Sequence, residues 1–203
     1  MTGAPRNRWD ERYDQESFFY GEAPNYFVAR ELVKIGPGRG LFLAEGEGRN
    51  GVFAAGLGHQ VTAVDSSAVG RRKALQLAAA RGVALDYRLA DLVADRWDDA
   101  AWDFIVLCFV HLPPEIMPGI HRRVAACLKP GGVLILNSFS KAQFGRTSGG
   151  PPHLEWLHDL EELKGQFPGL DLKAEEKEVD LREATGHIGP AMVIELTGIN
   201  PGG

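Results

Sequence analysis

The residues with the clearest chemical potential are a group of glycines and an acid in the first half of the chain. Gly46, Gly48 and Gly51 form a G-x-G-x-x-G pattern directly after the apolar run 41–44, and Asp65 closes the next apolar run. Glycines let backbone approach a ligand closely, and the N-terminus of a following helix offers free N–H groups to an anion. An acid at the end of the second strand can accept hydrogen bonds from a ribose. The pattern therefore predicts a nucleotide-binding α/β unit.

This glycine pattern fits more than one ligand. It does not distinguish S-adenosylmethionine from a nicotinamide dinucleotide, and a glycine turn in a ligand-free α/β protein is a third interpretation. The rest of the chain must decide between them.

Histidines supply the candidate bases. His111 follows the apolar run 104–109, which places it at the carboxyl edge where doubly wound sheets bind ligands. His187 lies in the segment 182–190, which we expect to overhang the same edge, and His153 follows two prolines in a predicted surface loop. For His111 and His187, the alternative is a structural histidine that only holds its turn by hydrogen bonds.

The elements that must position these residues follow from the apolar runs. Strands are predicted at 41–44, 61–64, 85–90, 104–109 and 133–136. Helices are predicted at 52–57, from a Ser66-Ser67 cap to Arg81, and along the apolar side from Ile116 to Leu128, where the turn 129–132 ends the helix. Alternating strands and helices indicate a parallel doubly wound sheet.

The alternation of strands and helices ends in the last third of the chain. A Gly/Ser/Pro loop over 143–152 precedes a short helix that begins at a capping box formed by Asp159 and Glu162. Two closing strands, 170–181 and 191–196, have no helix between them, and the segment 182–190 is predicted to join them as a hairpin.

The segment 1–35 precedes the glycine strand and is rich in aromatic residues. It contains Arg12, Tyr13 and Tyr20, whose polar ends a plug of the core would not need. Two interpretations stay open: the arm caps the core, or it closes over a ligand.

Composition limits the function classes. The chain has 203 residues, 44% hydrophobic and 24% charged, and a formal net charge of −5, which together predict one globular domain over 1–203. An acidic chain without a basic block argues against binding to nucleic acid or anionic membrane. Cys108 and Cys127 lie far apart and have no metal-site spacing, so we expect no metal; Cys108 falls in an apolar strand and Cys127 on the apolar face of a helix, so we expect buried thiols. With no apolar signal segment or membrane-length run, a cytoplasmic location is expected.

The order of these motifs resembles the class I S-adenosylmethionine-dependent methyltransferases over essentially the whole chain. A closer resemblance is to small bacterial methyltransferases related to the tellurite-resistance methyltransferase. It rests on WDERY at 9–13, YG at 20–21, PN at 24–25, LAEGEGRN at 43–50, HLP at 111–113, GGP at 149–151 and GH at 186–187. The fold implied is a Rossmann-like α/β sheet of seven strands, order 3-2-1-4-5-7-6, with only the last strand antiparallel.

The resemblance also implies S-adenosyl-L-methionine as cofactor and S-adenosyl-L-homocysteine as product. The residues that it implies for the cofactor site are Arg12, Tyr20, Ala44, Gly46, Gly48, Asn50, Asp65, Ser66, Asp91, Leu92 and Cys108. In this interpretation Asp65 accepts both ribose hydroxyls, Asp91 accepts from the adenine amino group, and the Leu92 N–H donates to a ring nitrogen. Asn50 and Arg12 would bind the amino-acid end, which Tyr20 would cover.

Two positions depart from the family pattern. Phe42 stands in the first strand where most class I members carry an acid, and Asn137 ends the fifth strand where close relatives carry one. Glu45 lies beside the glycines at a different position and is not treated as a substitute for the missing acid. Either departure can change substrate preference or weaken catalysis.

The expected function is methyl transfer to a small-molecule acceptor, such as a thiol or a metalloid oxyanion, with His111 and His187 as candidate catalytic residues. We expect no nucleic-acid or membrane partner, and a monomer or weak homodimer. One alternative is a noncatalytic module that binds S-adenosylmethionine. The other is an NAD(P)-binding oxidoreductase, against which the chain has no Tyr-x-x-x-Lys pair and no second dinucleotide half.

Overall fold

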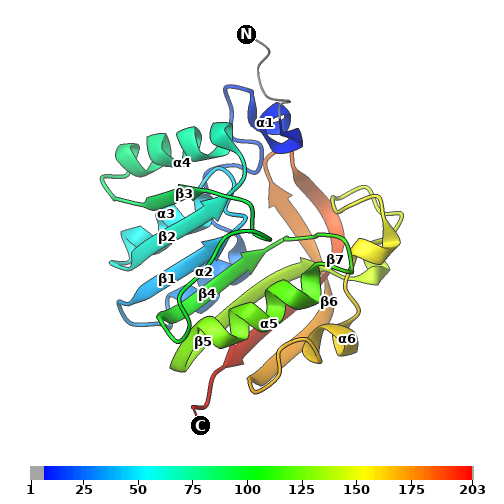
Figure 1. The fold of residues 1–203 in the computed structure, drawn as a ribbon. Helices are drawn as coiled ribbons and strands as arrows, with labels where there is room; N and C mark the ends of the chain where they lie inside the picture. The colour runs from blue at the N-terminus through cyan, green and yellow to red at the C-terminus, as the bar shows by residue number, and fades with distance from the viewer. Residues whose placement is uncertain (1–6, 203) are drawn as a thin grey trace.

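A seven-stranded sheet forms the centre of the protein in the computed structural model, which describes residues 7–202 (Figure 1). The strands are β1 (Arg39–Leu43), β2 (Gln60–Asp65), β3 (Asp86–Leu89), β4 (Trp102–Cys108), β5 (Leu128–Phe139), β6 (Asp171–Glu183) and β7 (His187–Ile199). Their order is β3-β2-β1-β4-β5-β7-β6, and β7 runs antiparallel to both of its neighbours. The predicted fold class and strand order are confirmed.

Helices cover both faces of the sheet. They are α1 (Arg8–Tyr13), α2 (Tyr26–Leu32), α3 (Arg49–Gly56), α4 (Ala68–Ala80), α5 (Met117–Cys127) and α6 (Leu160–Lys164), with 3-10 turns η1 (Lys141–Gln143) and η2 (Leu154–Trp156). In β4, Ile105 and Leu107 pack with α5 and α6, whereas Phe104 and Val106 pack with α2, α3 and α4. This alternation explains why the run is apolar at consecutive positions: both of its faces are buried.

Side-chain caps begin several helices. Ser67 accepts a hydrogen bond from the Gly70 N–H and starts α4, as predicted. Asp159 caps α6, but the predicted capping box is only half formed, because the Glu162 carboxylate pairs with Lys141 at 2.9 Å. The Lys141 ammonium offers that exposed carboxylate a charged partner within reach.

Two predicted boundaries were wrong. The expected turn at 129–132 lies inside β5, because Trp102 pairs with Leu128 while Phe104 pairs with Val133, so the extra residues of β5 bulge out of the ladder. The closing strands are also longer than predicted, so His187 begins β7 and does not lie in a loop. Pro190 had indicated that the strand begins after it. In the structure Pro190 lies in the part of β7 that pairs with β6 alone, where a missing N–H is tolerated.

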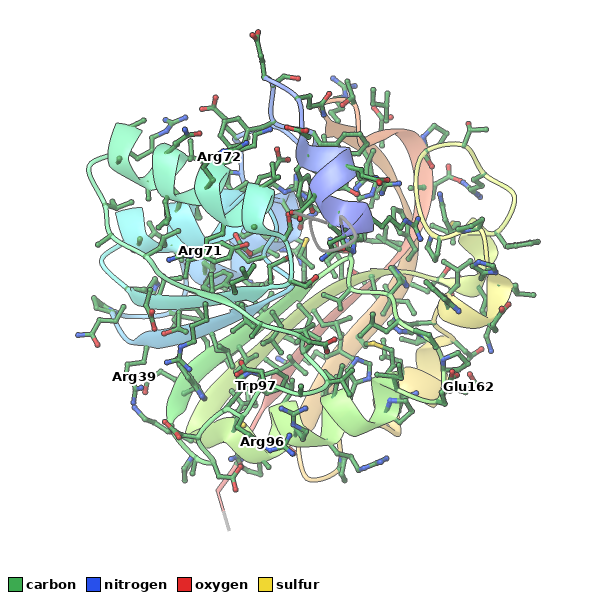
Figure 2. All side chains as sticks on the ribbon, turned by 45° about the horizontal axis from the view of Figure 1, so that its top comes forward. Arg39, Arg71, Arg72, Arg96, Trp97 and Glu162 are labelled. Carbon is green, nitrogen blue, oxygen red and sulfur yellow. The ribbon has the colours of Figure 1, made fainter. Side chains whose placement is uncertain are left out.

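Surface and interior are sharply divided along α4. Arg71 and Arg72 of α4 are both exposed (Figure 2), whereas the next residue, Lys73, is 5% exposed. A lysine is almost never buried unless it is paired, so its partners must be found in the interior. Among the helices of residues 7–202, none has both the length and the apolar character needed to cross a membrane.

Candidate active site

A cavity of about 290 Å³ lies at the carboxyl edge of the parallel strands. Its wall includes Ala44 after β1, Asp65 of β2, Asp91 after β3, Cys108 of β4 and His187 of β7. The turn from each strand into the next element brings these residues together, although they are far apart in the sequence. This is the position at which open α/β sheets bind ligands.

Most residues predicted for the site reach this cavity. Those lining it are Tyr20, Ala44, Asn50, Asp65, Ser66, Asp91, Leu92, Cys108, His111 and His187. Arg12, Gly46 and Gly48 do not line it. Arg12 packs over the rings of Trp9 and Phe19, and its guanidinium donates to the Tyr20 hydroxyl at 3.4 Å.

The two glycines make room for other parts of the protein. A Cβ atom at Gly46 would lie 2.6 Å from the Tyr13 hydroxyl, and one at Gly48 would lie 2.5 Å from the Cβ of Ala74 in α4. Both glycines also have positive φ angles, 60° and 89°, which favour glycine. In this structure they allow the arm and α4 to pack tightly against the loop.

The Asp65 carboxylate accepts hydrogen bonds from the turns that follow β1 and β2. Its Oδ2 accepts the Gly46 N–H at 2.9 Å and its Oδ1 accepts the Ser67 N–H at 2.8 Å. Burial raises its pKa, and these backbone hydrogen bonds oppose that effect. Each carboxylate oxygen keeps a further lone pair for a ligand hydroxyl. Ser67, and not Asp65, is the side-chain cap of α4.

The far end of the cavity is formed by the residues after β3. Asp91 is exposed, and its Oδ1 accepts the Val93 N–H at 2.7 Å. Leu92 is 9% exposed, and within residues 7–202 its backbone N–H has no hydrogen-bond acceptor. Because Leu92 lines the cavity, this free N–H suits a ligand that carries a hydrogen-bond acceptor.

Acids in the glycine loop line the cavity although the prediction did not include them. Glu45 Oε1 accepts the Gly51 N–H at 2.6 Å, and burial raises the pKa of Glu45 to about 7. Phe42, by contrast, is fully buried on the face covered by α2, α3 and α4. Three charged residues, Glu45, Glu47 and Arg49, stand in a loop otherwise made of small residues, and that contrast was the available sequence signal.

Two strands end at the cavity in unusual backbone conformations. Ala44 after β1 has φ 52° and Phe109 after β4 has φ 54°, both left-handed values that non-glycine residues rarely adopt. Such residues cost about 1–3 kcal/mol each and cluster at functional sites. The turn directs the Phe109 ring against Phe139, at 4.4 Å between centroids, and against His187, at 4.6 Å.

His111 has both ring nitrogens engaged. A carbonyl oxygen only accepts, so Nδ1 carries the proton and donates it to the Trp156 carbonyl at 2.8 Å. Nε2 then accepts the Phe139 N–H at 3.3 Å and lies 3.3 Å from Ser138 Oγ. Burial lowers the pKa of His111 to about 4. This geometry matches the structural alternative stated for this histidine.

His187 is held differently. Its Nδ1 lies 2.6 Å from Glu183 Oε2, and Glu183 also pairs with Arg49 at 2.9 Å and accepts from Asn25 Nδ2 at 2.9 Å. Burial acts to raise the pKa of Glu183, but the hydrogen bond from His187 and the charge of Arg49 outweigh it and lower that pKa to about 2. Burial lowers the pKa of His187, so its ring is neutral near pH 7. His153 is exposed and does not line the cavity.

The N-terminal arm forms one wall of the cavity through Trp9, Tyr13 and Tyr20. Buried Lys73 holds it in place. The ammonium donates to the carbonyls of Tyr13, Gln15 and Ser17 at 3.3, 3.1 and 2.6 Å. It also pairs with Glu47 of the glycine loop at 2.5 Å.

A second set of contacts docks the arm onto the start of α4. Asp10 Oδ1 accepts from Ser67 Oγ at 2.6 Å and from the Val69 N–H at 3.0 Å. Glu47 Oε2 accepts the Phe19 N–H at 2.7 Å. The arm is therefore bonded directly to the two turns that carry the predicted cofactor residues.

Comparisons with known proteins agree with this architecture. Residues 41–132 match the family model of a methyltransferase domain. TehB from Haemophilus influenzae is similar in structure, with a TM-score of 0.73 and 19% identity over 94% of this chain and 65% of that one. The N-methyltransferase NodS from Bradyrhizobium japonicum WM9, solved with S-adenosyl-L-homocysteine, has a TM-score of 0.71 and 16% identity over 96% of this chain and 97% of that one.

The fold and the cavity at its carboxyl edge define a Rossmann-like α/β protein of the class I methyltransferase type. Within this fold, residues 41–132 are similar to a methyltransferase domain, which makes S-adenosylmethionine the candidate cofactor. A curated relative, Hemagglutinin 1 from Eikenella corrodens, is 27% identical over 171 residues, which are 82% of this chain and 55% of that protein. The chain thus spans about half the length of the curated relative that it matches.

Proposed function

We propose that the protein methylates a small-molecule acceptor in this cavity, with a thiol or a metalloid oxyanion as candidate acceptors. The observation that supports this most is the presence, in one cavity, of suitable nucleotide-binding groups at one end and a histidine at the other. Asp65, Asp91 and the free Leu92 N–H lie at the first end, and His187 lies at the second. We also propose that residues 1–203 act as one domain whose arm, 1–35, covers the cofactor site through its described part, since residues 1–6 and 203 lie outside the described residues.

The donor set fits the cofactor. Asp65 has lone pairs left for two ribose hydroxyls, while the Leu92 N–H and the Asp91 carboxylate complement an adenine edge, which carries both an acceptor and a donor. Ser66, Ala44 and Cys108 would line the nucleoside. Asn50, Tyr20 and, after a small shift, Arg12 would receive the amino-acid end.

When bound, S-adenosylmethionine supplies a methyl group already activated on a sulfonium. The protein's own residues then have to orient the two reactants and exclude water. Orientation alone is worth about 7–11 kcal/mol in well-aligned systems. Aromatic rings form part of the cavity wall: Trp9, Tyr13 and Tyr20 come from the arm, and Phe109 follows β4. These rings restrict the entry of water and fix the position of the acceptor.

The cofactor is tested by ligand-dependent thermal unfolding. A ligand that binds only the native state must raise the melting temperature, so S-adenosyl-L-homocysteine should stabilise the protein and NAD(H) should not. Asp65→Asn should reduce this stabilisation. Asp86→Asn is the matched control, because Asp86 is an exposed strand carboxylate outside the cavity. Stabilisation by NAD(H) alone would favour the oxidoreductase alternative.

Catalysis is tested by release of S-adenosyl-L-homocysteine with a panel of thiols, metalloid oxyanions and small aromatic hydroxyls. Turnover with any member rejects the noncatalytic module. The net charge of −5 and the modest cavity favour a small acceptor over nucleic acid. Preferential methylation of RNA, DNA or intact protein would contradict the proposal.

A further inference from the structure

Two histidines line the same cavity, but only one presents a free nitrogen to it. His111 Nε2 is occupied by the Phe139 N–H, as described above. His187 donates through Nδ1 to Glu183, and within the part of the chain that the structure describes its Nε2 has no hydrogen-bond partner. Nε2 is also absent from the fully enclosed polar atoms found there without a partner. The ring therefore presents an accessible lone pair to the cavity.

The ring is fixed on several sides. Tyr20 and Phe109 each lie 4.6 Å from it between centroids, and Phe139 meets it edge-on at 5.0 Å. Gly149 closes another side, since a Cβ atom there would lie 2.3 Å from His187 Cδ2. Such a ring cannot turn to exchange its two nitrogens without displacing its neighbours. Glu183 then decides which nitrogen keeps the proton.

The charges around the cavity disfavour an anionic acceptor. Its lining contains four acidic side chains, of which Glu47 is paired with Lys73 while Glu45, Asp65 and Asp91 have no cationic side-chain partner among the described residues. Among the described residues that line it, Arg49 is the single arginine or lysine. Arg49 is already paired with Glu183 and donates to the Tyr20 carbonyl at 3.2 Å. No cation in this lining is left to receive an oxyanion, and a neutral acceptor avoids the repulsion.

We propose that the acceptor is a small neutral nucleophile with an X–H bond, a hydroxyl or a protonated thiol, and that His187 Nε2 removes its proton while Glu183 positions the ring. This inference rests on the proposed methyl transfer and narrows it, because it excludes the metalloid oxyanions. His187 is the catalytic residue and Glu183 is a positioning residue.

The atoms balance in this step. The X–H bond breaks as the proton moves to Nε2, the X–CH₃ bond forms, and the S–CH₃ bond of the sulfonium breaks with its electron pair left on sulfur. The imidazolium formed on His187 is stabilised by the Glu183 carboxylate, and it returns its proton to solvent once the products leave. General-base catalysis of this kind contributes about 10²–10⁴-fold.

The test compares wild type and His187→Asn with phenol, thiophenol and tellurite as acceptors at neutral pH. Asparagine can still donate to Glu183 but has no atom in the place of Nε2. His153→Asn is the matched control, because His153 is exposed and outside the cavity. We expect His187→Asn to lower kcat on phenol by about a hundredfold or more, and on thiophenol, which ionises readily in water, by less than about tenfold. The affinity for S-adenosyl-L-homocysteine should stay unchanged.

The positioning role of Glu183 is tested by measurements that would not change if Glu183 only stabilised the fold. Nitrogen NMR of the histidine rings should find His187 protonated on Nδ1 and bare on Nε2 at neutral pH. Glu183→Gln should lower the pKa of His187 and reduce kcat with little change in KM, and Glu183→Asp should recover part of the rate. If Glu183→Gln does not fold, the tautomer of His187 in the wild type and the rates of His187→Asn still test whether His187 Nε2 is the base.

Three results would overturn the inference: a proton on His187 Nε2, equal rates for His187→Asn and wild type on phenol, or tellurite methylated in preference to both X–H compounds. These are distinct from failure of the proposed function. That failure would appear as wild-type protein that gains no thermal stability from S-adenosyl-L-homocysteine, and in that case the tautomer measurement still tests the assignment of the ring.

Discussion

Replacing Lys73 by methionine should destabilise the protein by about 3–5 kcal/mol in the free energy of unfolding. The Lys73 and Glu47 side chains are 6% and 3% exposed, and their charges lie 2.5 Å apart. Methionine fills the space of the lysine stem but leaves Glu47 as a buried charge without its cation. The carbonyls of Tyr13, Gln15 and Ser17 lose their common donor as well.

Urea unfolding followed by tryptophan fluorescence measures the loss. The control is Lys164→Met, because Lys164 pairs with Glu161 at 3.0 Å while the two side chains are 39% and 74% exposed. Exposed pairs of this kind contribute about 0.2–1 kcal/mol. The double variant Lys73→Met with Glu47→Gln should recover part of the loss, because it removes the unpaired charge. If Lys73→Met costs no more than Lys164→Met, the arm is not held by this buried pair.

Four further outcomes are expected. Asp65→Ala should weaken S-adenosyl-L-homocysteine binding by about 1–3 kcal/mol in calorimetry, and unchanged affinity in a folded variant would show that the ribose is misplaced. Residues 9–20 should gain protection from amide exchange when that ligand is added; equal protection in both states would leave the arm as a structural plug. His111→Ala should lower the rate of methylation of thiophenol by less than about tenfold, which corresponds to about 1.4 kcal/mol. A hundredfold lower rate with phenol would instead identify His111 as the base. The free energy of unfolding should also fall as the pH drops from about 6.5 towards 4. Burial lowers the native pKa values of His111 and His121 to about 4, so these histidines are protonated in the unfolded chain at a higher pH than in the folded protein. The loss of stability is on the order of 3 kcal/mol per histidine. Denaturant midpoints that do not change over this pH range would contradict the burial of these rings.

Sequence reasoning was strongest where a local pattern determines local structure. The apolar runs, the glycine turn and the Ser67 cap depend on neighbouring residues, and the strand order came with the family resemblance. Asp65 at the end of β2 followed from the same logic, since a carboxyl-edge acid is placed by its strand. The ends of β5 and β7 were missed because a proline or a glycine pair signals a break, while pairing with neighbouring strands extended both.

The parts of the site that were missed depend on long-range contacts. Glu183 and His187 face each other across the β6–β7 turn, only four residues apart, but Arg49 of α3 meets Glu183 only in the folded protein, and the sequence does not reveal this. Likewise, Lys73 has the appearance of any surface lysine on α4 until its acceptors are known. The roles of His111 and His187 differ through single hydrogen bonds, which no residue pattern encodes.

The position of β7 in the sheet has a consequence for how the protein is made. During synthesis the strands emerge in chain order, but β6 pairs with β7 and with no other strand among the described residues. Until β7 leaves the ribosome, β6 is an unpaired strand and the edge of β5 is open, while β1 to β4 can already form their parallel ladder. A nascent chain would therefore assemble the nucleotide half first and gain His187 only when β7 inserts between its two neighbours. Methyl transfer would then switch on with the docking of one strand, and the exposed edges of β5 and β6 would be the surfaces most prone to aggregation before that moment.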